Sequence, residues 1–264
     1  MKSAKFGLST ATALVIANMV GTGVFTSLGF QVAGMSSGLA LLMLWALGGL
    51  IALLGALTYS EAGVIFPRCG GEYHYLTRMY HPAVGFMAGW ISLLVGFAAP
   101  VAAAAMALGR YAGNALSLPE QGSALPLLST SSWIAIAVIA AVTAVHSLDK
   151  VVGARFQDVI TAFKVVFIFV LIGLGLLLGK PAGLSFAANA AAWKDILSPA
   201  FAVSMYFVTF AYSGWNAAAY VAGEIKDPQR NLPRSLITGT LFVVVIYILL
   251  NFVFLYTVPL AEMA

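Results

Sequence analysis

Two glycine breaks interrupt long apolar stretches of the chain, at Gly21–Gly23 and at Ser213–Gly214. Backbone groups that lose their helical partners are costly in hydrocarbon unless they line a cavity or bind a ligand. A half-helix starting after the first break would offer free N–H groups and a partial positive charge, which suit a carboxylate. A half-helix ending near Tyr212 would offer free carbonyls and a partial negative charge, which suit an ammonium group. Together the breaks predict a site for the carboxylate and amine of an amino acid.

Taken alone, the first break has a simpler explanation. Small residues such as Gly21–Gly23 also form grooves in which membrane helices pack closely. The second break shifts the interpretation toward a binding site, because two well-separated broken helices are typical of transporters that bind substrate near the bilayer midplane. Phe210, Tyr212 and Trp215 could wall such a pocket, although aromatic side chains at helical spacing also pack in ordinary cores.

Lys164 is a further candidate, because it is the one residue among thirteen Lys and Arg that falls in the interior of a predicted span and not at its edge. It lies about seven residues, or roughly 10 Å of helix rise, from the start of that span. A charge inside the membrane is a functional candidate when it faces the interior of the helix bundle. Alternatively, its four-carbon stem lets the ammonium snorkel to the interface. Position alone leaves both interpretations open.

The elements that must position these groups are membrane helices. Hydrophobic residues make up 61% of the 264 residues and charged residues 8%, whereas soluble domains carry about 25% charged residues. Seven apolar runs approach or exceed the length of about 20 residues that a spanning helix needs, and they lack the period-two alternation of barrel strands. The runs are 7–32, 38–65, 83–108, 131–147, 157–179, 196–222 and 234–258.

The distribution of Lys and Arg predicts the topology. Nine of the thirteen fall in one set of loops and three in the other, so the positive-inside rule puts the N-terminus in the cytoplasm and Ala264 outside. The breaks lie in the first and sixth runs, five helices apart, which is the arrangement of inverted-topology repeats. We therefore expect a first five-helix repeat over 1–180 and the truncated start of a second repeat over 181–264.

Short motifs recur around the breaks and the loops next to them. They are Gly21–Phe25, Tyr59–Glu61, Gly70–Tyr73, Phe210–Asn216 and Glu224–Arg234. By these motifs the chain resembles the amino acid–polyamine–organocation (APC) superfamily, close to its L-type amino acid transporter (LAT) branch, over essentially its whole length. The resemblance implies an all-α membrane protein with the leucine-transporter-like inverted-repeat fold. That fold has twelve helices, so we expect an incomplete version with about seven, the first and sixth being discontinuous.

The resemblance also implies a set of substrate-binding residues at the two breaks. The backbone of the first break would meet the substrate carboxylate, and carbonyls of the second would meet its amine. Phe210 would also close the site from outside, and Asn216 matches a position that contacts substrate in the LAT branch. The implied substrate-binding residues are Met19, Gly21, Thr22, Gly23, Phe210, Ala211, Ser213 and Asn216.

Lys164 gains a role by the same resemblance. The segment Asp158–Lys164 is similar to the fifth helix of the family, in which a lysine occupies the place that a sodium ion takes in sodium-coupled relatives. This implies sodium-independent transport with Lys164 as the coupling residue. Proton coupling is possible as well, because the ammonium can titrate.

These observations predict a sodium-independent secondary transporter of L-amino acids, working by alternating access in the cytoplasmic membrane as a proton symporter or an exchanger. Neutral substrates are favoured, because no acidic residue lies near either break. A polyamine or amine permease is an alternative, and an amino acid sensor that does not transport is another. The sequence holds no nucleophile–base pair, phosphate loop or zinc motif, so we expect no enzyme activity, cofactor or metal. The scattered basic residues, with a net charge of +4, do not indicate a nucleic-acid partner.

Overall fold

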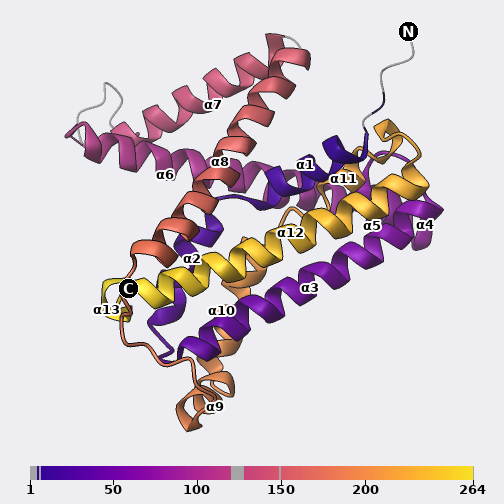
Figure 1. Cartoon of the computed structure of the whole chain (residues 1–264). Coiled ribbons are helices and arrows are strands. Elements are labelled where there is room, and N and C mark those ends of the chain that lie inside the picture. Colours follow the sequence, from indigo (N-terminus) through magenta and orange to yellow (C-terminus); the bar gives the residue numbers. More distant parts are fainter. Residues whose placement is uncertain (1–4, 6, 120–127, 149, 264) are drawn as a thin grey trace. The chain divides into compact units, whose positions relative to one another are not determined.

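The computed structural model describes residues 5, 7–119, 128–148 and 150–263, and every regular element within them is helical (Figure 1). They divide into two compact units, one comprising Leu76–Val159 and the other the described residues on either side of that segment. Helices α4 (Gly71–Met79) and α8 (Lys150–Leu178) run from one unit into the other. The remaining helices of the larger unit are α1 (Leu8–Met19), α2 (Gly23–Val32), α3 (Gly38–Ile65), α9 (Ala190–Ile196), α10 (Pro199–Ala211), α11 (Ala217–Tyr220), the 3-10 turn η2 (Ala222–Glu224), α12 (Pro228–Thr257) and α13 (Leu260–Met263).

The predicted spans agree with the helices. Six helical segments of the described chain are long and apolar enough to cross a membrane. The remaining predicted span, 196–222, which is the sixth along the chain, is divided into the 13-residue α10, a turn and the four-residue α11. Of these two helices, only α10 is an apolar helix of more than one turn. The six long segments are Leu8–Val32, Gly38–Ile65, Pro82–Ala115, Thr130–Ser147, Arg155–Leu178 and Pro228–Thr257.

The first span is broken between α1 and α2, as predicted. Val20 still donates its N–H to the carbonyl of Ile16 at 2.9 Å, but the N–H of Gly21 turns back to the carbonyl of Met19 at 2.9 Å. Helix α2 then begins at Gly23, and Thr22 accepts the N–H of Thr26 at 3.2 Å. The chain visibly leaves the helical path between these two short helices (Figure 1).

The sixth span is broken after Ala211, also as predicted. Residues 212–216 form a turn, and Gly214 has a φ of +99°, a conformation that side chains with a Cβ rarely adopt. A Cβ on Gly214 would lie 2.7 Å from the carbonyl oxygen of Asn18. Glycine is therefore required twice at this position, by the backbone conformation and by the close approach of the first span.

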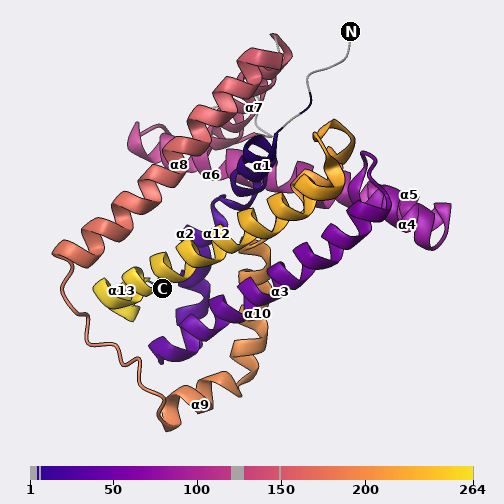
Figure 2. The same ribbon diagram turned by 45° about the vertical axis from the view of Figure 1, so that its right-hand side comes forward.

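Helices α3 and α12 run side by side through the larger unit, and α1 packs on α12 (Figure 2). Three fully buried aromatic side chains, Trp45, Tyr212 and Tyr247, meet between these helices and the turn after α10, with ring centroids 5.2–5.9 Å apart. The indole N–H of Trp45 donates to Gln31 Oε1 at 3.0 Å, so its polar edge is satisfied inside the core. The cluster contacts both breaks, because the hydroxyl of Tyr247 bonds the carbonyl of Met19 and Tyr212 is the first residue of the turn after α10.

Asp195, at the end of α9, holds the connection between α2 and α3. Its carboxylate accepts the backbone N–H groups of Ser36 and Ser37, each at 2.8 Å. These are N–H groups at the start of a helix, where a negative charge is favourable. The contact ties the segment before α10 to the turn that follows α2, so the two broken spans are held together at this end as well.

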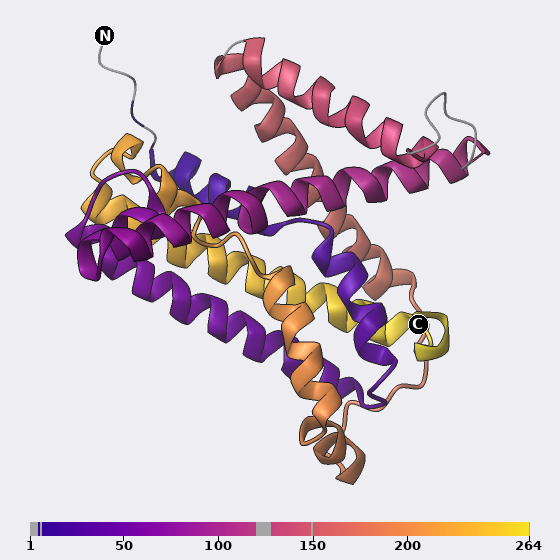
Figure 3. The same ribbon diagram turned by 180° about the vertical axis from the view of Figure 1, so that it is seen from behind.

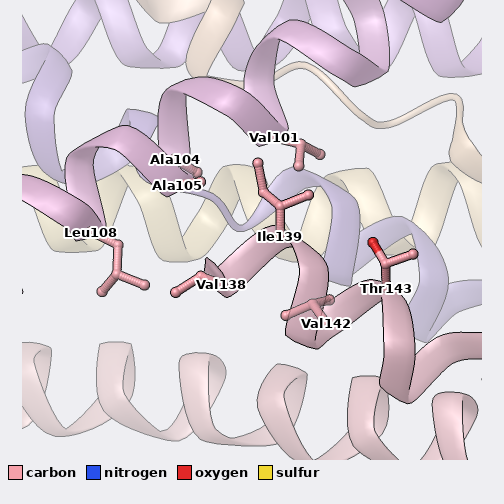
Figure 4. Close-up of a pocket in the computed structure, with 8 residues that line it drawn as sticks. All are labelled: Val101, Ala104, Ala105, Leu108, Val138, Ile139, Val142 and Thr143. Carbon is pink, nitrogen blue, oxygen red and sulfur yellow. The ribbon is translucent and has the colours of Figure 1, made fainter. Parts of the chain in front are cut away.

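The smaller unit contains α5 (Pro82–Ile91), the π-helical segment η1 (Ser92–Ala98), α6 (Ala99–Ala115) and α7 (Thr130–Leu148). Pro100 lacks the N–H that would bond the carbonyl of Gly96, and the π-helical segment precedes it. Helices α6 and α7 pack against each other (Figure 3), with Gly109 so close that a Cβ would lie 2.2 Å from the carbonyl oxygen of Ser131. An apolar hollow of about 310 Å³ lies between them, with the hydroxyl of Thr143 at its edge (Figure 4).

Candidate functional site

Lys164, on α8, reaches the break in the first span. Its ammonium donates to the carbonyl of Ala17 at 3.1 Å and to the carbonyl of Val20 at 2.8 Å. The last carbonyls of a helix have no intrahelical partner and carry the negative end of its dipole, so a cation is well placed there. The half-buried side chain lies against the break instead of extending to an interface. The structure thus shows the contact that a coupling role needs, while that role stays a prediction.

Met19 is held by a second long side chain. The hydroxyl of Tyr247, on α12, donates to the carbonyl of Met19 at 2.7 Å, and the Met19 side chain is 2% exposed. Sequence reasoning did not identify Tyr247, because nothing in the apolar run of α12 indicates a contact with the first span. Three carbonyls at the end of α1 are therefore engaged by side chains from two other helices.

The start of α2 offers the donors that the sequence predicts. The N–H groups of Gly23 and Val24 open the helix and so have no acceptor within it. Gly21 and Thr22 are exposed, and a Cβ on Gly21 would meet no atom within 4 Å. Open space beside free backbone donors is what a carboxylate needs for close approach.

Gly23 has a different environment from Gly21. A Cβ on Gly23 would lie 2.9 Å from the Cα of Ala211, the last residue of α10. The two broken spans thus touch at Gly23 and Ala211, and Ala211 itself is buried. Gly23 is therefore a packing residue as well as a predicted binding residue, which combines the two interpretations that the sequence left open.

The second break presents two of its predicted residues to the outside of the described chain. Phe210 is 50% exposed and Ser213 is exposed, and the N–H of Ser213 donates to the carbonyl of Phe210 at 3.0 Å. The N–H of Tyr212 is directed to the same carbonyl and to that of Val208. Phe210 and Ser213 thus leave room beside the break, as Gly21 does on the first span.

Two of the aromatic residues in this segment pack in or against the core, with Tyr212 fully buried and Trp215 partly buried. Tyr212 is 1% exposed, and its hydroxyl donates to the carbonyl of Trp45 at 3.1 Å. Trp215 packs edge-on against Tyr59, with ring centroids 4.9 Å apart, and covers Gly55. The ordinary-packing interpretation therefore holds for Tyr212 and Trp215.

Asn216 makes a contact that the sequence did not indicate. Its side-chain amide donates to Glu72 Oε1, and the hydroxyl of Tyr220 donates to the other oxygen of Glu72. Glu72 stands in one of the recognised motifs, but sequence reasoning gave it no partner because the contact spans 144 residues. The structure therefore brings a carboxylate of α4 to the end of the second break. The expectation that no acidic residue lies near either break is wrong, because the contact joins residues far apart in the sequence.

Taken together, two discontinuous helices meet at their breaks inside an all-helical unit, with a lysine ammonium at one break and free helix donors beside it. Six described segments are long and apolar enough to cross a membrane, and paired discontinuous helices of this kind are typical of the class of secondary transporters. The sequence matches the amino acid permease family over residues 6–264, and the chain belongs to that family. Its resemblance to the APC superfamily and to the LAT branch is thereby confirmed.

Similar proteins support the same assignment. The human Asc-type amino acid transporter 1 is 31% identical over 94% of this chain and 47% of its own length. The serine/threonine exchanger SteT of Bacillus subtilis is 32% identical over 98% of this chain and 56% of its own length. The human b(0,+)-type amino acid transporter 1 is 29% identical over 94% of this chain and 50% of its own length. The chain spans about half the length of the curated relatives it matches.

Proposed function

We propose that this chain builds the substrate and coupling site of a sodium-independent secondary transporter of L-amino acids. The observation that carries the proposal is the ammonium of Lys164 at the carbonyls of Ala17 and Val20. A fixed cation at this place supplies the positive charge that a bound Na⁺ would otherwise supply to the end of α1. Because the lysine ammonium takes the place of Na⁺, transport should not require sodium.

The substrate class is supported by the two breaks. Free donors at the start of α2 suit the α-carboxylate, and the carbonyl end of α10 suits the α-amine. Met19, Gly21, Thr22, Gly23, Phe210, Ala211, Ser213 and Asn216 are the proposed contacts. The name of one relative, a serine/threonine exchanger, favours small neutral amino acids. Coupling is by proton symport or by exchange, and the N-terminus is proposed to lie in the cytoplasm.

Counterflow in liposomes tests this proposal. The full-length protein is reconstituted with unlabelled L-serine inside, and uptake of external labelled L-serine is followed in buffers in which Na⁺ is replaced by K⁺. We expect accumulation of label that does not depend on Na⁺. Binding without counterflow would identify a sensor, and stimulation by Na⁺ would refute the proposed role of Lys164. Competition by a polyamine but not by neutral amino acids would favour an amine permease.

A further inference from the structure

Glu72 lies at a junction of two segments that are far apart in the sequence. Its carboxylate accepts hydrogen bonds from the amide of Asn216 in the turn after α10 and from the hydroxyl of Tyr220 on α11. The backbone reinforces the contact, because the N–H of Gly70 donates to the carbonyl of Tyr220 at 3.0 Å. Glu72 therefore fixes the end of the second break and α11 onto α4.

Carboxylate chemistry determines how Asn216 is oriented. An ionised carboxylate can only accept hydrogen bonds, whereas an asparagine amide has a donor end and an acceptor end. Asn216 must therefore turn its NH₂ group toward Glu72, and its Oδ1 must face the opposite way. No described residue donates a hydrogen bond to Oδ1. By binding the NH₂ group of Asn216, Glu72 thus holds Asn216 Oδ1 in a fixed orientation at the end of the second break.

We propose that Glu72 is a positioning residue for substrate recognition, which holds Asn216 so that its amide oxygen accepts a hydrogen bond from the substrate. The inference rests on the proposed function, since it assumes that an amino acid binds between the breaks. The oxygen of Asn216 adds a side-chain acceptor to the backbone carbonyls at the end of α10, and both suit an ammonium group. Glu72 does not touch the substrate and acts only through Asn216.

Three variants of the full-length protein in liposomes test the proposal, with labelled L-serine as the probe. In Glu72→Gln the new side chain can donate or accept, so Asn216 is free to turn either end toward the substrate. We expect the KM for uptake to rise about tenfold, the loss typical of one hydrogen bond to a charged group, while the maximal rate changes little. In Asn216→Asp two carboxylates face each other, and we expect a larger rise in KM.

The double variant Glu72→Gln with Asn216→Asp tests whether the two residues act as a hydrogen-bonded pair. The glutamine amide can donate to the new carboxylate at position 216, which again directs an acceptor oxygen toward the substrate. We expect its KM to return to within about threefold of the wild-type value, because the pair is coupled. Glu61→Gln, which removes an exposed carboxylate from α3, is the matched control and should leave the KM unchanged. Thermal unfolding of each variant shows that the fold is retained.

The possible failures can be distinguished. A wild-type protein that transports L-serine, with an unchanged KM in Glu72→Gln, would overturn the positioning role alone. So would a double variant no better than Asn216→Asp, because the restored hydrogen bond should again direct an acceptor oxygen toward the substrate. A wild-type protein that neither binds nor transports L-serine or any other amino acid would overturn the proposed function itself, and the positioning role with it.

Discussion

The ammonium nitrogen of Lys164 lies 2.8 Å from the carbonyl oxygen of Val20, the first residue after α1. The two residues are separated by 144 positions in the chain, and each supplies the hydrogen-bond partner that the other lacks. The carbonyl loses its helical donor at the break, and the ammonium needs acceptors inside an apolar bundle. Their contact is the structural basis of the proposed sodium independence.

Removal of the Lys164 ammonium should abolish most transport. Lys164→Met keeps the length of the side chain but leaves the carbonyls of Ala17 and Val20 without its hydrogen bonds. Because an unsatisfied buried carbonyl costs about 1–3 kcal/mol, we expect initial uptake of labelled L-serine to fall about tenfold or more. Lys180→Met, which removes an exposed lysine after α8, is the control. Normal uptake by Lys164→Met would identify Lys164 as a packing residue only.

The pH dependence of uptake tests whether Lys164 also carries the coupled proton. If it does, the initial rate into liposomes should rise as the external pH falls, and Lys164→Met should give a flat profile because no titrating group remains at the break. The measurement is the initial rate against external pH for both proteins at fixed membrane potential. A pH dependence that survives the substitution would place proton coupling at another residue, and a flat wild-type profile would leave exchange as the coupling mode.

Substitutions at Gly21 and Gly23 should separate binding from packing. A side chain at Gly21 enters open space beside the donors of α2, whereas a Cβ at Gly23 meets the backbone of Ala211 at 2.9 Å. We expect Gly21→Leu to abolish binding of L-serine while the unfolding temperature stays unchanged. Gly23→Ala should lower the stability by about 1–3 kcal/mol, as overpacking typically does, in addition to weakening binding.

Calorimetric binding and thermal unfolding, measured on the same detergent-solubilised preparations, check this pair. If Gly21→Leu bound L-serine with wild-type affinity, the first break would not be part of the binding site. Equal unfolding temperatures for wild type and Gly23→Ala would mean that the contact between the two broken spans relaxes easily.

Tyr75, on α4, offers a test of the core beside Glu72. It is 3% exposed, and its hydroxyl has no hydrogen-bond partner among the described residues. Burial, together with the charge of Glu72, raises the pKa of Tyr75 to about 12, so the phenol stays protonated at neutral pH. We expect Tyr75→Phe to raise the free energy of unfolding by up to about 1 kcal/mol, because a buried hydroxyl without a partner is unfavourable.

Thermal unfolding in detergent measures this effect. Tyr206→Phe, at a position that is 70% exposed, is the control and should leave the unfolding temperature unchanged. A lower unfolding temperature for Tyr75→Phe would show that the hydroxyl forms a hydrogen bond in the membrane-embedded protein.

The helices and their breaks could be predicted because each depends on local sequence. Long apolar runs indicate spanning helices, and Gly21–Gly23 and Ser213–Gly214 interrupt two of them. The contact of Lys164 with the first span was expected from the resemblance to a family, and position alone had left it open. The roles of the site residues, the repeat boundary at residue 180 and the orientation in the membrane stay predictions.

What the sequence could not predict are contacts between distant side chains. Glu72 and Asn216 are 144 residues apart, and Tyr247 and Met19 are 228 residues apart. Neither pair follows from helical periodicity, because periodicity shows which face of a helix is apolar and not which residue of another helix it meets. Tyr212 and Trp215 illustrate the same limit, since their aromatic character fits a pocket wall and a core equally well.

The side-chain contacts at the end of α1 have a consequence for biosynthesis. The carbonyls of Ala17, Met19 and Val20 are engaged by Lys164 and Tyr247, which are translated long after the first span. At about 5–20 residues per second, Tyr247 leaves the ribosome roughly ten seconds or more after Met19. During that interval lipid offers these carbonyls no donors. We therefore expect the first span to enter the bilayer as a more continuous helix, which opens at its glycines only when the later helices arrive.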